Sequence, residues 1–267
     1  MLKRLIVLLS LALGLPVAAQ AEACGMDTAC PLGERSYHLR VPDDWDGTSS
    51  LPVLLHFHGW ARQGDLVVRH QRIAGHTRRR GVLLVAPNGR QKTWDFRRAN
   101  SADVPFAAAV LEDVAKNYPI DRTRLYVSGY SYGAAMAWRY TCQNGDGVTA
   151  LLAISGTLRE GADCPQAPAQ VRQVYGFDDT VMRLDFGPGR NETRPVDMWL
   201  KLFGCGAGDA KGPYKVVDWL TFERRQWTDC DTGQTVTLDL HPGGHFIPHG
   251  WIGRQLDELL GRTPTYP

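Results

Sequence analysis

The sequence of 267 residues lacks an excess of charge of either sign. It holds 30 lysines and arginines against 28 aspartates and glutamates. Two of the basic residues, Lys3 and Arg4, lie in the N-terminal leader described below, so the remaining chain is formally neutral. Binding to nucleic acid or to an anionic membrane depends on clustered positive charge, and we therefore expect neither partner. The dense cluster Arg78-Arg79-Arg80 is interpreted as a solvated helix end.

Long apolar runs are missing after the first residues. Leu5–Leu15 is apolar and follows the two basic residues, and the small-x-small pattern of Ala19-Gln20-Ala21 comes shortly after it. The run is too short for a permanent membrane span. We expect residues 1–21 to be a cleaved signal peptide of a secreted or periplasmic protein without a membrane anchor. A lipoprotein signal that ends at Cys24 is the alternative, and the Glu-Ala pair before that cysteine argues against it.

Linkers rich in serine, threonine or proline are absent, and so are internal repeats. Both would mark an additional module. Residues 22–267 are therefore expected to form a single domain, and a chain of this length suits one α/β domain with a large core.

The C-x-x-C pattern of zinc and redox sites is also absent, although the chain has six cysteines. An even number of cysteines behind a signal peptide indicates disulfides formed in an oxidising compartment. Six cysteines allow fifteen pairings, and we favour the sequential one. We expect no metal and no cofactor. The favoured pairs are Cys24–Cys30, Cys142–Cys164 and Cys205–Cys230.

Apolar runs of strand length alternate with segments of helical periodicity along the whole chain. This alternation predicts an α/β fold with a doubly wound, mostly parallel sheet and helices on both of its faces. The ligands of such sheets lie at the carboxyl ends of the strands. The predicted strands include 36–41, 51–57, 81–86, 124–128, 148–154, 171–175, 214–219, 222–227 and 235–240, and the predicted helices are about 65–79, 101–117, 132–142, 195–203 and 251–260.

One stretch carries a chemical signature, the sequence Gly129-Tyr130-Ser131-Tyr132-Gly133. It joins an apolar, β-branched run to an Ala/Met/Trp-rich helical segment. A Gly-x-Ser-x-Gly turn between a strand and a helix is typical of a nucleophile elbow, which exposes the serine hydroxyl at the edge of the sheet. The sequence thus predicts Ser131 as a nucleophile for acyl transfer.

A serine nucleophile needs a base, and the base needs an acid that orients it. After the elbow, Asp178 and Asp179 follow a predicted strand, and we favour Asp179 with Asp178 as the reserve. His245 follows two glycines after the last strand and is the favoured base. The other histidines nearby, His241 and His249, lie among prolines and glycines that exclude a metal-binding helix.

Two backbone N–H groups are needed to bind the oxyanion that forms during acyl transfer. The N–H of Tyr132, directly after the nucleophile, is the first candidate. The N–H of Trp60, in the loop after the strand 51–57, is the second. Trp60, Trp94, Tyr130 and Tyr132 are also candidates to line an aromatic acyl site, with Trp94 and Tyr130 as substrate-binding residues.

The chain resembles the secreted polyhydroxybutyrate depolymerase-like and feruloyl esterase group, which is similar to carbohydrate esterase family 1. The resemblance implies the α/β-hydrolase fold, with the nucleophile on Ser131, the acid on Asp179 and the base on His245. It also matches the two later cysteine pairs. The chain departs from the group's His-Gly-x-x-Asp pattern at Tyr175–Asp179. The residues that carry the resemblance are 55–60, 86–89, 120–133 and 243–245.

These patterns together predict a secreted serine esterase that hydrolyses carboxylic esters through an acyl-enzyme. Feruloyl or acetyl esters and hydroxyalkanoate oligomers are the competing substrate classes. A serine peptidase on the same fold and a catalytically inactive binding protein are the alternatives in function. The ester substrate is the only partner that we expect.

Overall fold

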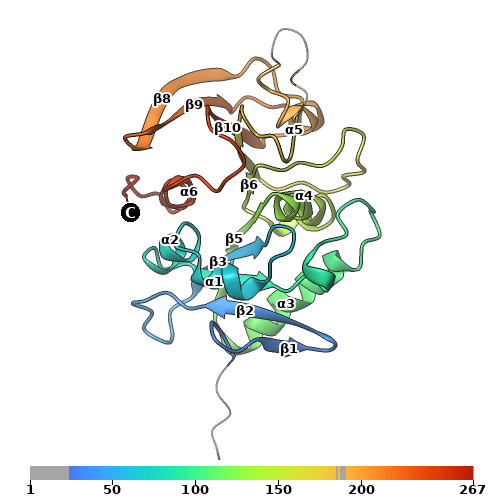
Figure 1. The fold of residues 1–267 in the computed structure, drawn as a ribbon, viewed down its shortest axis with the longest axis vertical. Helices are drawn as coiled ribbons and strands as arrows, with labels where there is room; N and C mark the ends of the chain where they lie inside the picture. Colours follow the sequence, from blue (N-terminus) through green and yellow to red (C-terminus); the bar gives the residue numbers. More distant parts are fainter. Residues whose placement is uncertain (1–23, 185, 187–190, 267) are drawn as a thin grey trace, which may run out of the picture.

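The computed structural model describes residues 24–184, 186 and 191–266, and the predicted signal peptide lies outside them. The described chain forms a ten-stranded sheet in the order β1-β2-β4-β3-β5-β6-β7-β10-β9-β8 (Figure 1). The strands from β4 to β10 in this order are parallel, and antiparallel strands flank them at both edges. The strands are Cys30–Leu32 (β1), Arg35–Arg40 (β2), Leu51–Phe57 (β3), Leu83–Pro87 (β4), Ile120–Tyr130 (β5), Ala150–Ile154 (β6), Gln170–Gly176 (β7), Asp209–Val217 (β8), Leu220–Trp227 (β9) and Thr235–His241 (β10).

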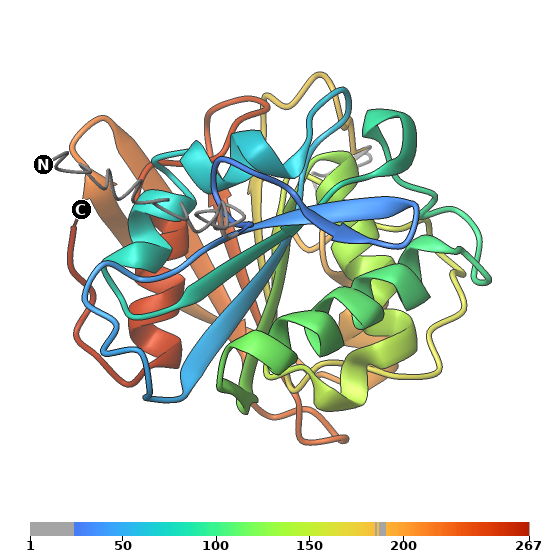
Figure 2. The same ribbon diagram turned by 90° about the horizontal axis from the view of Figure 1, so that it is seen from below.

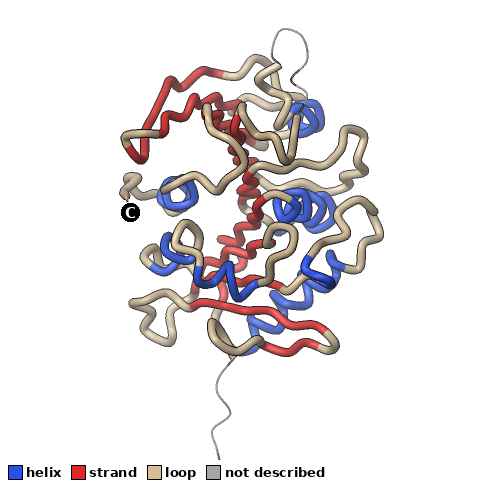
Figure 3. The backbone as a smooth tube through the Cα atoms, viewed as in Figure 1, coloured by secondary structure: helices blue, strands red, loops and turns tan. Residues whose placement is uncertain are grey.

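Helices cover both faces of this sheet, so the predicted α/β architecture is confirmed. Figure 3 shows the strands as a central column, with α1, α2 and α6 on one side and α3, α4 and α5 on the other. Each side has its own apolar core. The helices are Gly64–Arg69 (α1), Ala74–Arg78 (α2), Asp103–Asn117 (α3), Tyr132–Asn144 (α4), Asp197–Phe203 (α5) and Trp251–Leu259 (α6), and single 3-10 turns lie at Arg90–Lys92 and Gly145–Gly147.

The central strands are buried on both faces, which explains their nearly continuous apolar runs. All seven residues of β3 and all five of β6 are buried. Alternate side chains of β3 enter opposite cores, with Leu54 on the side of α6 and Leu55 on the side of α4. Because both faces need apolar side chains, the strands lack the polar-apolar alternation of a half-exposed sheet.

The predicted helix over residues 65–79 is wrong, because the chain forms two short helices there. α1 ends at Arg69, and α2 begins at Ala74. The ring of His70 accepts the N–H of Arg72 at 3.2 Å, so a side chain satisfies a donor that a helical carbonyl would otherwise bind. Both short helices still reach the same core through Val68 and Ala74.

The interpretation of Arg78-Arg79-Arg80 as a solvated helix end is also corrected. Arg80 is 4% exposed, and its guanidinium forms a bidentate ion pair with Asp257 of α6 at 2.8 Å for each hydrogen bond. Arg78 pairs with Asp43 on the surface. The cluster therefore joins α2 to α6.

Three disulfides link the chain in the sequential pattern favoured from the sequence. They join Cys24 to Cys30, Cys142 to Cys164 and Cys205 to Cys230. Of the helices that the structure describes, none has both the length and the apolar character to cross a bilayer.

The parallel arrangement brings several loops to one edge of the sheet. Figure 2 shows the parallel strands side by side between the two helical layers. The loops that follow β3, β5, β6, β7 and β10 all leave the sheet at its carboxyl edge, because these strands are parallel neighbours. Segments far apart in the sequence meet there.

Candidate active site

Ser131 stands at the sharp turn between β5 and α4. Its backbone angles are φ 58° and ψ −122°, a strained conformation for a residue with a side chain. Its N–H donates to the carbonyl of Ile154 at 2.9 Å, which fixes the turn against β6. A Cβ on Gly129 would lie 2.1 Å from the carbonyl oxygen of Gly133, and one on Gly133 would lie 2.0 Å from that of Phe57. Only glycine permits this close approach.

His245 and Asp179 meet at the same edge of the sheet. His245 Nδ1 and Asp179 Oδ2 are 2.7 Å apart, although 66 residues separate them in the sequence. The other carboxylate oxygen of Asp179 accepts the N–H groups of Val181 and Met182 at 2.9 Å each. Asp178, the reserve candidate, is exposed. Among the described residues, its side chain makes no hydrogen bond to His245.

The surroundings of Asp179 keep its carboxyl group ionised. Burial acts to raise its pKa, but the hydrogen bonds from His245 and from the Met182 and Val181 N–H groups outweigh it and hold the pKa below its ordinary value. Because the ionised carboxylate of Asp179 can only accept a hydrogen bond, the proton of the His245 ring lies on Nδ1. The other ring nitrogen, Nε2, is then free to act as a base. No hydrogen bond between Ser131 Oγ and the His245 ring is recorded in the described part of the chain.

Tyr130 holds the loop that carries His245. Its hydroxyl donates to the carbonyl oxygen of His245 at 2.9 Å, and the two rings lie with centroids 4.9 Å apart. Burial, followed by the nearby charge of Asp179, raises the pKa of the Tyr130 hydroxyl to about 12, so it remains a donor. The structure thus places Tyr130 against His245 and not in the cavity described below.

Residues 58–62 follow β3 beside the elbow and are here named the oxyanion loop after the oxyanion donor predicted at Trp60. His58 is buried, with Nδ1 2.8 Å from the carbonyl oxygen of Gly59, and its Nε2 accepts the Gly89 N–H at 3.0 Å. Burial lowers the pKa of His58 to about 4, so its ring is neutral and satisfies both neighbouring groups. Among the described residues, the N–H groups of Trp60 and Tyr132 donate to no backbone carbonyl. Trp60 as a whole is 66% exposed.

Trp94 lies in the core, contrary to its prediction as a substrate-binding residue. It is 3% exposed, packs edge-on against Phe57, and its indole N–H donates to the carbonyl of His58 at 2.8 Å. A neighbouring hydrogen bond joins the Ala61 N–H to the Lys92 carbonyl at 2.9 Å. The indole therefore satisfies the backbone carbonyl of the first residue of the oxyanion loop.

A cavity of about 1240 Å³ adjoins the elbow, although Ser131, Asp179 and His245 are not among the residues that line it. Tyr132, the residue after Ser131, lines it together with Phe96, and their rings meet edge to face at 5.1 Å. Its second wall is the segment 157–164, here named the cavity wall. This wall begins beside Ser131, since a Cβ on Gly156 would lie 2.3 Å from the Ser131 carbonyl oxygen. Further lining residues are Trp138, Tyr175, Met182, Leu184, Met198 and Leu202.

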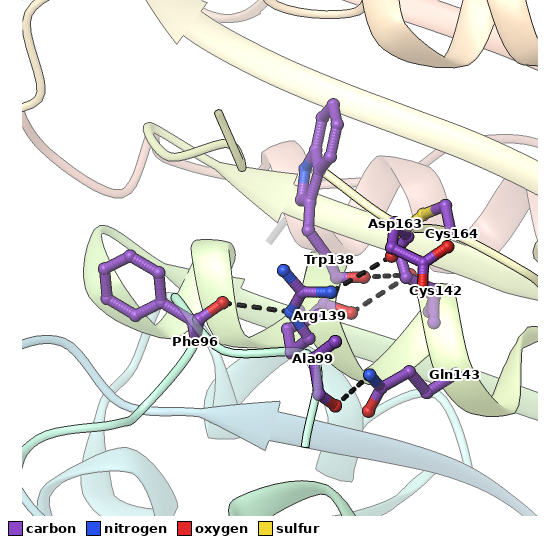
Figure 4. Close-up of a disulfide and its surroundings, with 10 residues drawn as sticks. Phe96, Ala99, Trp138, Arg139, Cys142, Gln143, Asp163 and Cys164 are labelled. Atoms are coloured by element: carbon purple, nitrogen blue, oxygen red, sulfur yellow. Dashed lines mark hydrogen bonds between the residues drawn. A yellow bond between two sulfur atoms is a disulfide. The ribbon is translucent and has the colours of Figure 1, made fainter. Parts of the chain in front are cut away.

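Two contacts from α4 tie the sides of this cavity together (Figure 4). Arg139 is 3% exposed, and its guanidinium donates to the carbonyl of Phe96 at 3.0 Å and to that of Asp163 at 3.1 Å. The disulfide Cys142–Cys164 joins the same helix to the end of the cavity wall. Sequence reasoning missed Arg139, although an arginine within an Ala/Met/Trp-rich helix signals a buried cation with fixed partners.

The remaining histidines near the site serve the fold. His56 is buried with Nδ1 3.0 Å from Ser128 Oγ, and burial lowers its pKa to about 3. His241 accepts the Gly243 N–H, which shapes the start of the loop before His245. Within the described ranges, histidine, cysteine and acidic side chains do not gather in threes as metal ligands.

Sequence comparison relates the chain to fungal esterases. Probable feruloyl esterase C of Aspergillus niger is 26% identical over 237 residues, which cover 85% of this chain and 84% of the relative. Feruloyl esterase C of Emericella nidulans is 28% identical over 70% of this chain and 75% of its own length. Feruloyl esterase D of Neurospora crassa is 23% identical over 90% and 87%. No protein-family model matches the chain.

Comparison with solved structures establishes the fold. An acetyl xylan esterase from Aspergillus awamori superposes with a TM-score of 0.64 over 85% of this chain and 94% of that one, at 13% identity. A fluorophosphonate-binding serine hydrolase of Staphylococcus aureus gives a TM-score of 0.56 over 85% and 92%, also at 13% identity. The fold is that of the α/β-hydrolases.

Proposed function

We propose that the chain is a carboxylic ester hydrolase like the feruloyl esterases that it resembles, and that it uses Ser131, His245 and Asp179 as its catalytic triad. The observation that carries this proposal is the 2.7 Å contact between His245 and Asp179 at the sheet edge where the strained turn presents Ser131. The order Ser, Asp, His along the chain is the order of α/β-hydrolases.

The proposed reaction proceeds in two halves. His245 Nε2 accepts the proton of Ser131 Oγ as the oxygen attacks the ester carbonyl, while Asp179 stabilises the imidazolium. The N–H groups of Tyr132 and Trp60 donate to the oxyanion of the tetrahedral intermediate. When the C–O bond breaks, the imidazolium returns its proton to the leaving alcohol. Water then attacks the acyl-enzyme and gives a proton to His245. As the bond between the acyl carbon and Ser131 Oγ breaks, the imidazolium returns that proton to Oγ, and the carboxylic acid leaves.

We further propose that the acyl group is aromatic, as in feruloyl esters. Two observations support this choice: the names of the relatives, and a cavity beside Ser131 that Phe96 and Tyr132 line with aromatic rings. Acetyl esters and hydroxybutyrate oligomers remain the competing classes. We also propose secretion or export to the periplasm, which the three disulfides support.

An activity panel of methyl ferulate, acetylated xylan and hydroxybutyrate oligomers tests the substrate, with a peptide substrate to separate esterase from peptidase.

Ser131→Ala should abolish hydrolysis of p-nitrophenyl acetate while the circular dichroism spectrum is unchanged. Asp179→Asn should lower kcat by about 10⁴-fold. Asp178→Asn, the matched control, should leave it nearly unchanged.

Hydrolysis at the wild-type rate by Ser131→Ala would refute the triad. Equal losses in the two aspartate variants would refute the choice of acid. Absence of a covalent fluorophosphonate adduct on the native protein would indicate a binding protein in place of an enzyme.

A further inference from the structure

A second cavity lies at the edge of the sheet opposite to Ser131. It has a volume of about 230 Å³ and borders the starts of β3 and β4. We name it the arginine pocket, because five of its described lining residues are arginines and Asp44 is the one acidic residue among them. The arginines are Arg78, Arg79, Arg80, Arg124 and Arg262.

Three of these arginines have carboxylate partners, and two have none. Arg79 and Arg262 form no ion pair with a carboxylate among the described residues, and the exposed Asp44 pairs with none of the five. Arg262 Nη1 instead donates to the carbonyl oxygen of Arg80 at 3.1 Å, which places another guanidinium beside the cluster. The three neutralised pairs are Arg78–Asp43, Arg80–Asp257 and Arg124–Asp121.

The two unpaired guanidinium groups leave an excess of positive charge around the arginine pocket. Burial, followed by the charges of Arg78 and Arg80, lowers the pKa of Arg79. A guanidinium nevertheless stays protonated at ordinary pH, so the repulsion between these groups persists in the folded protein and destabilises it. An anion bound between them would replace this repulsion with attraction.

The remaining walls of the arginine pocket supply neutral donors. The N–H groups of Ser50 and Gly81 line it and, among the described residues, donate to no backbone carbonyl. Guanidinium forks and free backbone N–H groups are the donors that bind the oxygens of phosphate and sulfate in proteins. The volume of about 230 Å³ is larger than one such ion.

We propose that the arginine pocket binds a divalent oxyanion, phosphate or sulfate, with Arg79 and Arg262 as its principal ligands. The pocket and Ser131 lie at opposite edges of the sheet, so this inference does not depend on the proposed function. The walls come from residues 42–52, from the end of α2 and from the segment after α6. A bound anion would therefore join three parts of the chain and stabilise the fold by mass action.

Thermal unfolding of the native protein at pH 7.5 tests the proposal. The melting temperature is measured in 20 mM sodium phosphate, in 20 mM sodium sulfate and in sodium chloride of equal ionic strength. A dissociation constant of about 1 mM should raise Tm by about 4 °C in phosphate or sulfate relative to chloride. No rise with either ion would overturn the proposal.

Arg79→Gln should abolish this rise. Because the substitution also removes a repelling charge, the variant should be at least as stable as the native protein in chloride. An arginine that only supported the fold would instead lower Tm in chloride and leave the rise unchanged, and that result would contradict the proposal. Arg262→Gln should abolish the rise as well, and it decides the matter if Arg79→Gln does not fold.

Arg159→Gln is the matched control. Arg159 is an exposed arginine of the cavity wall, and it has no carboxylate partner in the described ranges. This variant and Ser131→Ala should both keep the native rise. Loss of the rise in Arg159→Gln would place the anion in the cavity beside the elbow and overturn the arginine pocket as its site. The hydrolytic activity of the native protein enters none of these outcomes, so failure of the proposed function leaves them interpretable.

Discussion

The two sides of Ser131 are built in different ways. On one side, the oxyanion loop is fastened to residues 88–94 by backbone and buried side-chain hydrogen bonds, among them those of His58 and Trp94. On the other side, the cavity wall borders an open volume of about 1240 Å³. There, Arg139 and one disulfide provide the ties to α4 (Figure 4).

This difference corresponds to the two tasks of an ester hydrolase. Oxyanion binding needs donors that are fixed before the reaction begins, because reorganising them would cost activation free energy. On the side of the oxyanion loop, Ala61, Gln91 and Lys92 have strained backbone conformations with positive φ. Substrate selection needs space and a few well-placed side chains. Catalysis and selectivity should therefore respond to different substitutions.

Among the substitutions that distinguish the two sides of Ser131, the largest effect is expected from removing a single N–H in the oxyanion loop. Trp60→Pro deletes the proposed second oxyanion donor and should lower kcat by about 10²- to 10³-fold, equally for acetyl and aromatic esters. Trp60→Ala keeps the N–H and should retain most of kcat. Steady-state kinetics with both esters measures this, and similar losses in the two variants would assign the effect to the indole ring.

A smaller effect is expected on the stability of the folded protein in acid, which the buried His58 should lower. Its pKa is about 4 in the folded protein and near 6.5 when unfolded. Between these values only the unfolded chain binds the proton, so stability falls as the pH drops from 6.5 to 4 and is constant above. His58→Gln should reduce this acid-induced loss by about 2 kcal/mol at pH 4.5.

Urea unfolding at pH 7.5 and 4.5 measures that difference. His249→Gln is the control. Burial also lowers the pKa of His249, but at a partly exposed site, so this variant should reduce the acid-induced loss much less than His58→Gln does. An unchanged acid-induced loss in His58→Gln would contradict the buried, neutral state of this histidine.

The smallest effect is expected on the cavity side. Arg139→Lys keeps the positive charge but cannot reach both carbonyls with a planar fork. The cavity sides should then separate, with KM for methyl ferulate rising by about ten-fold and p-nitrophenyl acetate little affected. Arg159→Lys, on the exposed part of the same wall, is the control. An equal loss on both esters would place Arg139 with the catalytic side.

Much of the fold was predictable because its signals are local. The buried runs of β3 and β6 and the glycines around Ser131 are readable without any partner in view. The break between α1 and α2 was not predictable. One long helix and two short helices that pack on the same core give the same spacing of apolar residues. Arg80 was misread for a similar reason, because its partner Asp257 lies 177 residues away.

The aromatic residues show the same limit within the site. A tryptophan or tyrosine in a loop looks equally suited to a pocket and to a core. Contacts decided that Trp94 satisfies the His58 carbonyl and that Tyr130 holds the loop of His245.

The sequence by itself determined the α/β class and the elbow at Ser131, because a period of burial and a turn that only glycine allows are properties of neighbouring residues. It also supplied the candidates Asp179 and His245, by their positions after strands. The tertiary structure alone decided which aspartate meets the histidine, which aromatic side chains face the cavity, and that Arg139 spans its two sides. These depend on distances between segments that only the packed sheet and its helices define.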